Sequence, residues 1–311
     1  MTSPRISVCI ATYRRPERLA PLLRDLAKQT LLPSQIVVVD NDVNRAGEPV
    51  VESFKAELAA ANVPLDVVYD TQLERSISLT RNCTVALADG DWLAFIDDDE
   101  RAPCDWLQQM HETALSFQAD GVLGPVVPVL PEHAPDWIRK GDFYSFPRLH
   151  TGENVPLNQL CIGNVLLRAI PVRTLRGPFD PAFKLAPGED GDMLIRFIRQ
   201  GAKVVWNDEA IVSEPVHSSR LSFKWLIQRA FGGGQEFARK TLTGAYGPVG
   251  PLLRLKLAAD AFSKMGVSMM LAILLLPLGR HRAAYWVFRA SANLGKLSAF
   301  SGARHQEYAA I

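Results

Sequence analysis

The chain has 311 residues, of which 48% are hydrophobic and 22% are charged, and its formal net charge is +1. Such values describe an ordinary globular protein with room for one large domain, or for one domain with an appendage. The four cysteines are far apart and form no C-x-x-C motif, which argues against a zinc site or a disulfide framework and fits a reducing cytoplasm. The first apolar run, at 6–11, is short and is followed rather than preceded by arginines, so no signal peptide is expected.

Strands and helices alternate in the pattern of the first 130 residues. Continuous apolar runs predict strands at 6–13, 35–42, 65–70, 92–99 and 121–130. Apolar residues at helical spacing predict helices after Pro16, at 48–61, at 77–89 and after Pro103. Because these crossovers are long enough for parallel pairing, we expect an α/β fold with a doubly wound, mostly parallel sheet.

The pattern after residue 131 is less regular. Trp137 and Phe143 lie in a proline-rich stretch, where we expect core packing rather than stacking on a sugar. Strands are expected at 161–168 and 202–207, and a helix with an acidic start at 188–201. The segment 223–240 predicts a helix that is interrupted by three consecutive glycines at 232–234.

Polar side chains follow three of the predicted strands. They are Thr12, Tyr13 and Arg14 after the first strand, Asp40 and Asp42 after the second, and Asp97 to Asp99 after the fourth. In open α/β sheets, ligands bind beyond the carboxyl ends of the strands, so we expect a site at this edge. The first strand is followed by neither G-x-G-x-x-G nor a Walker A lysine loop, which disfavours a dinucleotide oxidoreductase and a P-loop nucleotidase.

Four consecutive carboxylates, Asp97 to Glu100, end the apolar run of "AFIDDDER" at 94–101. Two unit charges about 4 Å apart repel by roughly 4 kcal/mol at an effective dielectric constant near 20. The cluster is therefore either fully solvated or a cation site, and a position directly after a buried strand favours the cation. Carboxylate oxygens suit Mg²⁺ or Mn²⁺. If the strand continues to Asp99, alternation directs Asp97 and Asp99 to the same side and Asp98 to the other.

Four motifs, in this order, resemble the inverting, family 2 glycosyltransferases of the GT-A fold, and within them the bacterial exopolysaccharide enzymes of the succinoglycan glucosyltransferase type. The motifs are "SVCIATYRRPERLAPLLRDLAKQT", "IVVVDND", "SISLTRNCTVALADGDWLAFIDDDE" and "GEDGDMLIRF". The resemblance implies a metal-dependent transfer from a nucleoside-diphosphate sugar, expected to be UDP-linked. It also implies a glycan or polyprenyl-linked acceptor and a role in exopolysaccharide synthesis.

The resemblance further implies roles for individual residues on the donor side. Thr12, Tyr13 and Arg14 are expected near the nucleotide, and Asp40 on the base, although "DNDV" departs from the family's usual continuation. Arg81, in "TRN", is expected near the nucleotide or diphosphate, where an arginine fork suits phosphate, with a helix-surface arginine as the alternative. Asp97 and Asp98 are expected at the nucleotide sugar and Asp99 on the metal.

An inverting transfer also needs a general base near the acceptor hydroxyl. The resemblance assigns this base to Asp190 of "GED", with Glu189 beside it. The alternative is that these acidic residues cap the start of the helix. His217 is a further candidate metal ligand, with a local structural role as the alternative. Arg220 and Arg229 either close over the diphosphate or are solvated.

Two other functions remain open. A sugar nucleotidyltransferase shares a similar sheet but calls for a glycine-rich loop after the first strand, which "ATYRRPERL" lacks. A non-catalytic sugar-nucleotide-binding protein needs neither Asp99 nor Asp190. A haloacid-dehalogenase-like phosphatase carries its aspartates after the first strand rather than the fourth.

The end of the chain is basic and apolar. Residues 251–311 hold eight Lys or Arg and two acidic residues, a net charge of +6, which favours an anionic partner. Fifteen uncharged residues, 265–279, are too few to span a bilayer, and Tyr285 and Trp286 follow. We expect a catalytic domain at 1–245 and a membrane-associating helical segment at 246–311, lying in the plane of the membrane or re-entering it, with a buried helix as the alternative. The protein is expected in the cytoplasm at the inner face of the plasma membrane, without a nucleic-acid partner.

Overall fold

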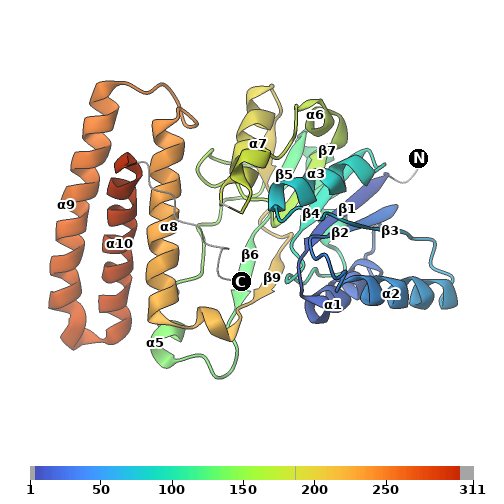
Figure 1. Cartoon of the computed structure of the whole chain (residues 1–311), viewed down its shortest axis with the longest axis horizontal. Helices are drawn as coiled ribbons and strands as arrows, with labels where there is room; N and C mark the ends of the chain where they lie inside the picture. Colours follow the sequence, from blue (N-terminus) through green and yellow to red (C-terminus); the bar gives the residue numbers. More distant parts are fainter. Residues whose placement is uncertain (1–3, 186, 302–311) are drawn as a thin grey trace. The chain divides into compact units, whose positions relative to one another are not determined.

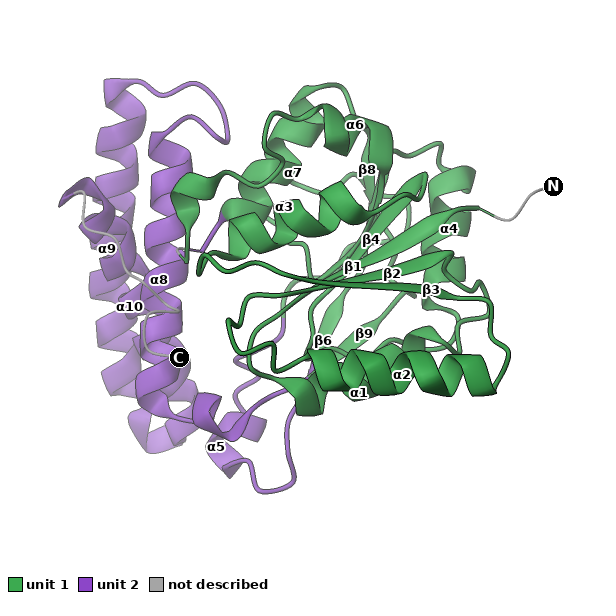
Figure 2. Ribbon diagram, turned by 45° about the vertical axis from the view of Figure 1, so that its right-hand side comes forward, with its two compact units in different colours: residues 1–127, 146–185, 189–214 green, residues 128–145, 186–188, 215–311 purple. Residues whose placement is uncertain are grey.

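The structure is a computed structural model that describes residues 4–185 and 187–301. Figure 1 labels its helices and strands. The chain forms two compact units, coloured separately in Figure 2. Unit 1 comprises residues 1–127, 146–185 and 189–214, and unit 2 comprises 128–145, 186–188 and 215–311.

Unit 1 is built on a seven-stranded sheet with the order β3-β2-β1-β4-β7-β5-β8. The strands are β1 (Ile6–Thr12), β2 (Gln35–Asp40), β3 (Asp66–Thr71), β4 (Trp92–Ile96), β5 (Gly121–Leu123), β7 (Asn164–Arg168) and β8 (Val204–Trp206). Only β7 runs antiparallel to its neighbours in this sheet. The predicted doubly wound, mostly parallel sheet is therefore confirmed.

Helices cover both faces of this sheet, as Figure 2 shows. They are α1 (Pro16–Leu26), α2 (Glu48–Ala60), α3 (Ile77–Leu87), α4 (Trp106–Ser116), α6 (Ala169–Thr174) and α7 (Glu189–Arg199), with a 3-10 turn η1 (Pro181–Phe183). Helix α1 buries a stripe of four leucines against the strands, beside α2, while α3 lies on the opposite face. Strands buried on both faces need apolar residues at successive positions, which is what the continuous apolar runs of β1 and β2 supply.

Two predicted strands have different ends in the structure. Strand β4 stops at Ile96, so Asp97 to Asp99 lie in a turn and the alternation expected for them does not apply. The predicted strand 121–130 is two strands, β5 and β6 (Val126–Val129), and β6 pairs with β9 (Val212–Pro215). Gly124 and Pro125 separate them, because Pro125 has no N–H for a ladder and its carbonyl accepts a hydrogen bond from Asn164 Nδ2 at 3.0 Å.

Unit 2 is mainly helical. It contains α5 (Asp136–Arg139), η2 (Ser218–Arg220), α8 (Phe223–Leu242), α9 (Pro251–Leu275), η3 (Leu276–Leu278), α10 (Arg280–Ser298) and η4 (Ala299–Ser301). Helix α10 packs against both α8 and α9. Trp137 and Phe143 pack with Phe288 and other apolar residues of this unit, which confirms the core role expected for both.

The interruption predicted in α8 is wrong, because the helix runs unbroken through Gly232–Gly234. A Cβ atom at Gly234 would lie 1.9 Å from the carbonyl oxygen of Ala292 in α10, and one at Gly295 would lie 2.1 Å from that of Phe231 in α8. The glycines therefore allow two helix backbones to approach closely. Glycine in a helix interior is about 1 kcal/mol less favourable than alanine, and the close packing of the two helices offsets this cost.

Helix α9 and η3 form an exposed apolar segment. Residues Pro251–Leu278 contain an 18-residue stretch with a mean hydropathy of 1.8, and the segment is long and apolar enough to cross a membrane by length and composition. Much of the apolar surface is at the end of the segment, where Ile273 is 71% exposed and Leu278 is 60% exposed. The predicted C-terminal apolar helical segment is thus present, with α9 ending at Leu275 and η3 at Leu278, directly before Gly279.

Candidate active site

The ends of β1 and β4 meet because these two strands are neighbours in the sheet. The hydroxyl of Thr12, the last residue of β1, donates a hydrogen bond to Asp98 Oδ2 at 2.7 Å. Both residues are buried, at 4% exposure each. The polar residues that follow the two strands therefore lie together at the carboxyl edge of the sheet, where ligands of α/β proteins bind.

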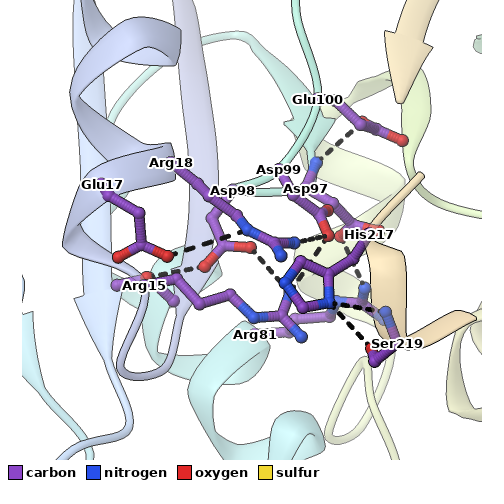
Figure 3. Close-up of polar contacts among 11 residues, drawn as sticks. Arg15, Glu17, Arg18, Arg81, Asp97, Asp98, Asp99, Glu100, His217 and Ser219 are labelled. Carbon is purple, nitrogen blue, oxygen red and sulfur yellow. Dashed lines mark hydrogen bonds and ion pairs between the residues drawn. The ribbon is translucent and has the colours of Figure 1, made fainter. Parts of the chain in front are cut away.

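Two arginines at the start of α1 contact the acidic turn, as Figure 3 shows. Arg15 Nη1 lies 3.3 Å from Asp98 Oδ1 and 3.2 Å from Asp99 Oδ2, and Arg18 Nη1 lies 2.8 Å from Asp99 Oδ2. Asp98 and Asp99 are thus on one side, where they share a guanidinium. Neither arginine was a predicted site residue, although "YRRPERL" places both just after β1.

Arg81 of α3 joins the acidic turn to the start of α7. Its Nη2 lies 3.1 Å from Asp97 Oδ1, and its Nη1 lies 2.6 Å from Glu189 Oε1. The side chains of Arg81 and Glu189 are 8% and 6% exposed, so water screens their ion pair weakly, whereas Asp97 is 47% exposed and its pair with Arg81 is more open to water. The structure therefore brings together residues from three of the four sequence motifs.

Glu100 closes the turn that carries the aspartates. Its backbone N–H donates to the carbonyl of Asp97 at 3.1 Å, and its Oε2 accepts a hydrogen bond from the N–H of Asp97 at 2.9 Å. A Cβ atom at Gly163 would lie 2.6 Å from Glu100 Oε1. The loop before β7 therefore approaches the turn at a position where glycine leaves room for the Glu100 side chain. Glu100 was part of the predicted acidic cluster, but this use of its side chain was not predicted.

The pKa values of the acidic turn report its excess of negative charge. Burial, followed by the charge of Asp99, raises the pKa of Asp98 to about 7, while Arg15 and the hydroxyl of Thr12 act in the opposite direction. Burial also raises the pKa of Asp97, with further contributions from Asp99 and Asp190 and an opposing one from Arg81. The pKa of Glu100 is raised well above its usual value, first by burial and then by Asp97. Three guanidinium groups thus offset much of the repulsion in this cluster, but not all of it.

The carboxylate of Asp40 is fully buried within its own loop. Its Oδ1 accepts from the N–H of Asp42 at 2.9 Å, and its Oδ2 accepts from the N–H of Gly47 at 2.8 Å and from the hydroxyl of Tyr69 at 3.1 Å. Burial and the charge of Asp40 raise the pKa of Tyr69. Asp40 therefore shapes the loop 40–47, and its expected contact with a nucleobase stays a prediction.

Tyr13 and Arg14 form an open cationic and aromatic surface after β1. The guanidinium groups of Arg14 and Arg75 each lie 5.1 Å from the centre of the Tyr13 ring, and Arg14 Nε lies 3.0 Å from Asp42 Oδ1. Arg14 adopts a positive φ of 52°, which turns the chain sharply between β1 and α1. An aromatic ring beside cations suits a planar base and phosphates.

Glu189 and Asp190 occupy the first turn of α7 but have different surroundings. Glu189 is buried and paired with Arg81, whereas Asp190 is half-buried and its Oδ1 accepts a hydrogen bond from the N–H of Gly191 at 2.6 Å. Asp192, in the same turn, pairs with Arg196 at 2.8 Å. Asp190 therefore differs from Glu189 and Asp192, which pair with arginines, and its side chain retains access to solvent.

The acidic turn fits a hard cation by the chemistry of its donors. Carboxylate oxygens on adjacent residues, with pKa values raised first by burial and then by one another's charge, suit Mg²⁺ or Mn²⁺. Within residues 4–185 and 187–301, no three His, Cys, Asp or Glu side chains are grouped closely enough to form a ready metal site. His217 belongs to unit 2, where its Nδ1 lies 2.8 Å from Ser219 Oγ, as Figure 3 also draws. Its role as a ligand stays a prediction.

Comparison with known proteins identifies the class to which this site belongs. The sequence profile described as "Glycosyl transferase family 2" matches residues 7–166. Over 305 residues the chain is 33% identical to the succinoglycan biosynthesis protein ExoM of Rhizobium meliloti, covering 97% of this chain and 94% of that protein. The chain therefore belongs to glycosyltransferase family 2, as its motifs indicate, and it is a glycosyltransferase.

More distant relatives support the fold. A glucosyl-dolichyl phosphate glucuronosyltransferase of Haloferax volcanii is 25% identical over 248 residues, which cover 74% of this chain and 75% of that protein. A mannosyltransferase, PcManGT from Pyrobaculum calidifontis, solved with GDP-Man and Mn²⁺, superposes with a TM-score of 0.61 at 17% identity, covering 96% of this chain and 88% of that one. S. aureus TarS with UDP superposes with a TM-score of 0.54 at 17% identity, covering 96% and 92%. Unit 1 thus has the predicted GT-A fold.

Proposed function

We propose that this protein is a metal-dependent inverting glycosyltransferase that moves a sugar from a nucleoside-diphosphate sugar, UDP-linked, to a lipid-linked oligosaccharide or related glycan in exopolysaccharide synthesis. The observation that carries the proposal is the double ion pair of Arg81. It holds the acidic turn after β4 and the acidic start of α7 in one site. An inverting transfer needs both, the first for the leaving diphosphate and the second for the acceptor hydroxyl.

The donor nucleotide is assigned to the surface after β1. Thr12, Tyr13 and Arg14 lie at the carboxyl edge of the sheet, with Asp40 shaping the adjacent loop. Asp97 and Asp98 are assigned to the nucleotide sugar, and Arg81 to the same region. Three superposable structures contain UDP, UDP-GlcNAc or GDP-Man, which supports a nucleotide-sugar donor.

Asp99 is the residue we assign to Mg²⁺ or Mn²⁺. Such a cation, when bound, offsets the charge that develops on the leaving diphosphate. Arg15 and Arg18 contact Asp99 in the structure, and guanidinium groups at this position also suit phosphate oxygens. The Mn²⁺ in the mannosyltransferase structure supports a divalent cation in this family of folds.

Asp190 is the proposed general base. The acceptor oxygen forms a bond to the anomeric carbon, the bond from that carbon to the phosphate oxygen breaks, and the nucleoside diphosphate leaves with the electron pair. The carboxylate of Asp190 takes the proton of the hydroxyl. Glu189 is less suited to this task, because its carboxylate is buried and already paired with Arg81 at 2.6 Å.

The acceptor and location are argued from relatives and from unit 2. ExoM is named for succinoglycan biosynthesis, and the Haloferax relative for a lipid-linked acceptor, glucosyl-dolichyl phosphate. The exposed apolar segment Pro251–Leu278 supports a place at a membrane surface, where such acceptors lie. We therefore assign the protein to the inner face of the plasma membrane, in the cytoplasm.

A donor screen tests this function directly. The purified protein is incubated with UDP-, GDP- and dTDP-sugars, with Mn²⁺ or Mg²⁺ and a lipid-linked glycan fraction, and the release of nucleoside diphosphate is measured. We expect release with one donor class, dependence on the cation, and a product whose anomeric configuration by NMR is opposite to that of the donor. Release of pyrophosphate would identify a nucleotidyltransferase instead. Tight donor binding without turnover on any acceptor would identify a binding protein.

A further inference from the structure

Unit 2 contains a surface cavity that the transfer reaction does not use. Its volume is about 220 Å³, and it lies where α5, the end of α9 and the start of α10 meet. The lining side chains include Lys140, Leu275, His281, Arg282, Tyr285 and Trp286. All of these residues belong to unit 2, so the cavity is complete within that unit.

The polar part of the cavity wall is basic. Lys140 and Arg282 are exposed cations, His281 adds ring nitrogens, and the lining contains no acidic side chain. Helix α10 starts at Arg280 beside the cavity, with no side-chain N-cap and no acidic residue in its first turn. Basic side chains near a helix N-terminus repel the positive end of the helix dipole. An anion in the cavity would relieve this repulsion, so the charge of the lining is complementary to a phosphate.

The shape of this corner is fixed by its backbone. Gly279 separates η3 from α10 with a φ of +134°, a conformation that L side chains rarely adopt. A Cβ atom there would lie 2.9 Å from His281 Cε1. The chain therefore turns tightly enough to place the end of α9 next to the basic first turn of α10.

The other side of the cavity is apolar. Leu275 lines it, and the same end of α9 and η3 exposes Ile273, Leu276 and Leu278 at 71%, 59% and 60%. Tyr285 and Trp286, with ring centres 5.3 Å apart, also line the cavity. Such side chains settle at the headgroup level of membranes. A soluble phosphate would use the basic wall alone, whereas a lipid would use both.

We propose that this cavity binds the phosphate group of an anionic bilayer phospholipid, while the exposed end of α9 and η3 enters the acyl region. This inference rests on the membrane location proposed above but not on the transfer chemistry. The site orients unit 2 on the membrane through one specific phosphate contact. Without this site, the attraction of unit 2 to an anionic membrane would depend on its net positive charge alone.

The test uses the full-length protein and flotation with vesicles of phosphatidylcholine, with and without phosphatidylglycerol. The pocket variant is Lys140→Gln/Arg282→Gln. The matched control is Arg254→Gln/Lys256→Gln, which removes the same charge from two exposed positions near the start of α9, about 30 Å along the helix from Leu275. Thermal melting verifies that both variants are folded.

We expect the wild type to prefer anionic vesicles, the pocket variant to bind them at least about tenfold more weakly, and the control to stay within about threefold of the wild type. Equal losses in the two variants, or equal binding of the wild type to neutral and anionic vesicles, would overturn the proposal. Inorganic phosphate alone is the third probe. We expect millimolar phosphate to leave vesicle binding unchanged, and competition by it would identify a site for a free anion instead.

Transfer activity in detergent separates this inference from the proposed function. We expect the pocket variant to retain the wild-type rate there, because none of its residues belongs to the candidate active site. A protein that floats with anionic vesicles through this cavity but transfers no sugar would refute the enzyme assignment and leave the lipid site standing. A protein that transfers sugar but ignores anionic vesicles would refute the lipid site.

Discussion

Arg81 shows how much of the site depends on a single side chain. Its two carboxylate partners, Asp97 and Glu189, lie 16 and 108 residues away in the sequence. Removing one partner from a buried ion pair costs about 3–5 kcal/mol, because the other charge is left without compensation. The position of the acidic turn relative to α7 is therefore fixed by electrostatics as well as by the packing of the helix.

The base assignment is tested with Asp190→Asn. The amide keeps the size of the side chain but cannot accept the proton, so turnover should fall by roughly 10² or more while donor affinity is retained. Steady-state kinetics and donor binding by calorimetry measure the two quantities. Asp192→Asn is the matched control, because it removes a charge from the same helix turn and breaks only the contact with Arg196. If the two variants lose equal activity, Asp190 is not the base, and Glu189 becomes the candidate.

The metal assignment is tested with Asp99→Asn. Loss of this carboxylate should abolish transfer and remove the dependence of donor binding on Mn²⁺, because an amide is a weaker ligand for a hard cation. Donor titrations with and without Mn²⁺ measure this effect. Asp120→Asn serves as the control, since Asp120 is an acidic residue of the same unit that pairs with Arg168 at 3.3 Å. Wild-type transfer by Asp99→Asn would place the cation elsewhere.

Sequence patterns indicated the motifs of the candidate site but not its pairings. Thr12, Asp98, Arg81 and Glu189 all came from the motifs, and the structure places them in contact as two pairs, Thr12 with Asp98 and Arg81 with Glu189. Arg15, by contrast, was not among the predicted site residues, because no pattern says that it bonds a carboxylate 84 residues away. Such contacts depend on the order of strands in the sheet, and a single sequence does not carry that order.

At the scale of elements, the strands and helices of unit 1 were the most predictable part. Continuous apolar runs and helical leucine stripes are strong local signals, and β1, β2 and α1 follow them closely. The failures have tertiary causes. The carbonyl of Pro125 is bonded by a side chain from β7, and Gly234 of α8 lies against the backbone of α10, so neither effect is visible in the local pattern.

The glycines of α8 provide a prediction about stability. Gly234→Ala places a methyl group 1.9 Å from a backbone oxygen of α10, so the helices must separate, at a cost of about 1–3 kcal/mol. Gly233→Ala is the neighbouring control, because a Cβ atom there has no atom within 4 Å. It should stabilise the helix by about 0.5–1 kcal/mol. Chemical denaturation measures both changes, and equal effects of the two substitutions would contradict the close approach of α8 and α10.

At the scale of the whole molecule, the cation should matter for chemistry but not for folding. Arg15, Arg18 and Arg81 already contact the acidic turn and offset its charge within the protein. EDTA should therefore abolish transfer while the melting temperature stays within about 2 °C of its value without EDTA. Thermal melting by circular dichroism, in parallel with the transfer assay, measures both. A large fall in melting temperature would show that a cation is part of the fold.

The direction of β7 determines which parts of the chain tolerate a change of length. Because β7 runs against its neighbours, its first residue, Asn164, pairs with Ile96 at the edge where β4 ends. The loop that leads into β7, rather than the one that leaves it, therefore delivers Gly163 to the acidic turn. One residue inserted directly before Asn164 would push a side chain into Glu100, whereas an insertion after Arg168, at the far end of the same strand, would leave the turn untouched. The acidic turn thus constrains loop length on the entry side of this strand but not on its exit side.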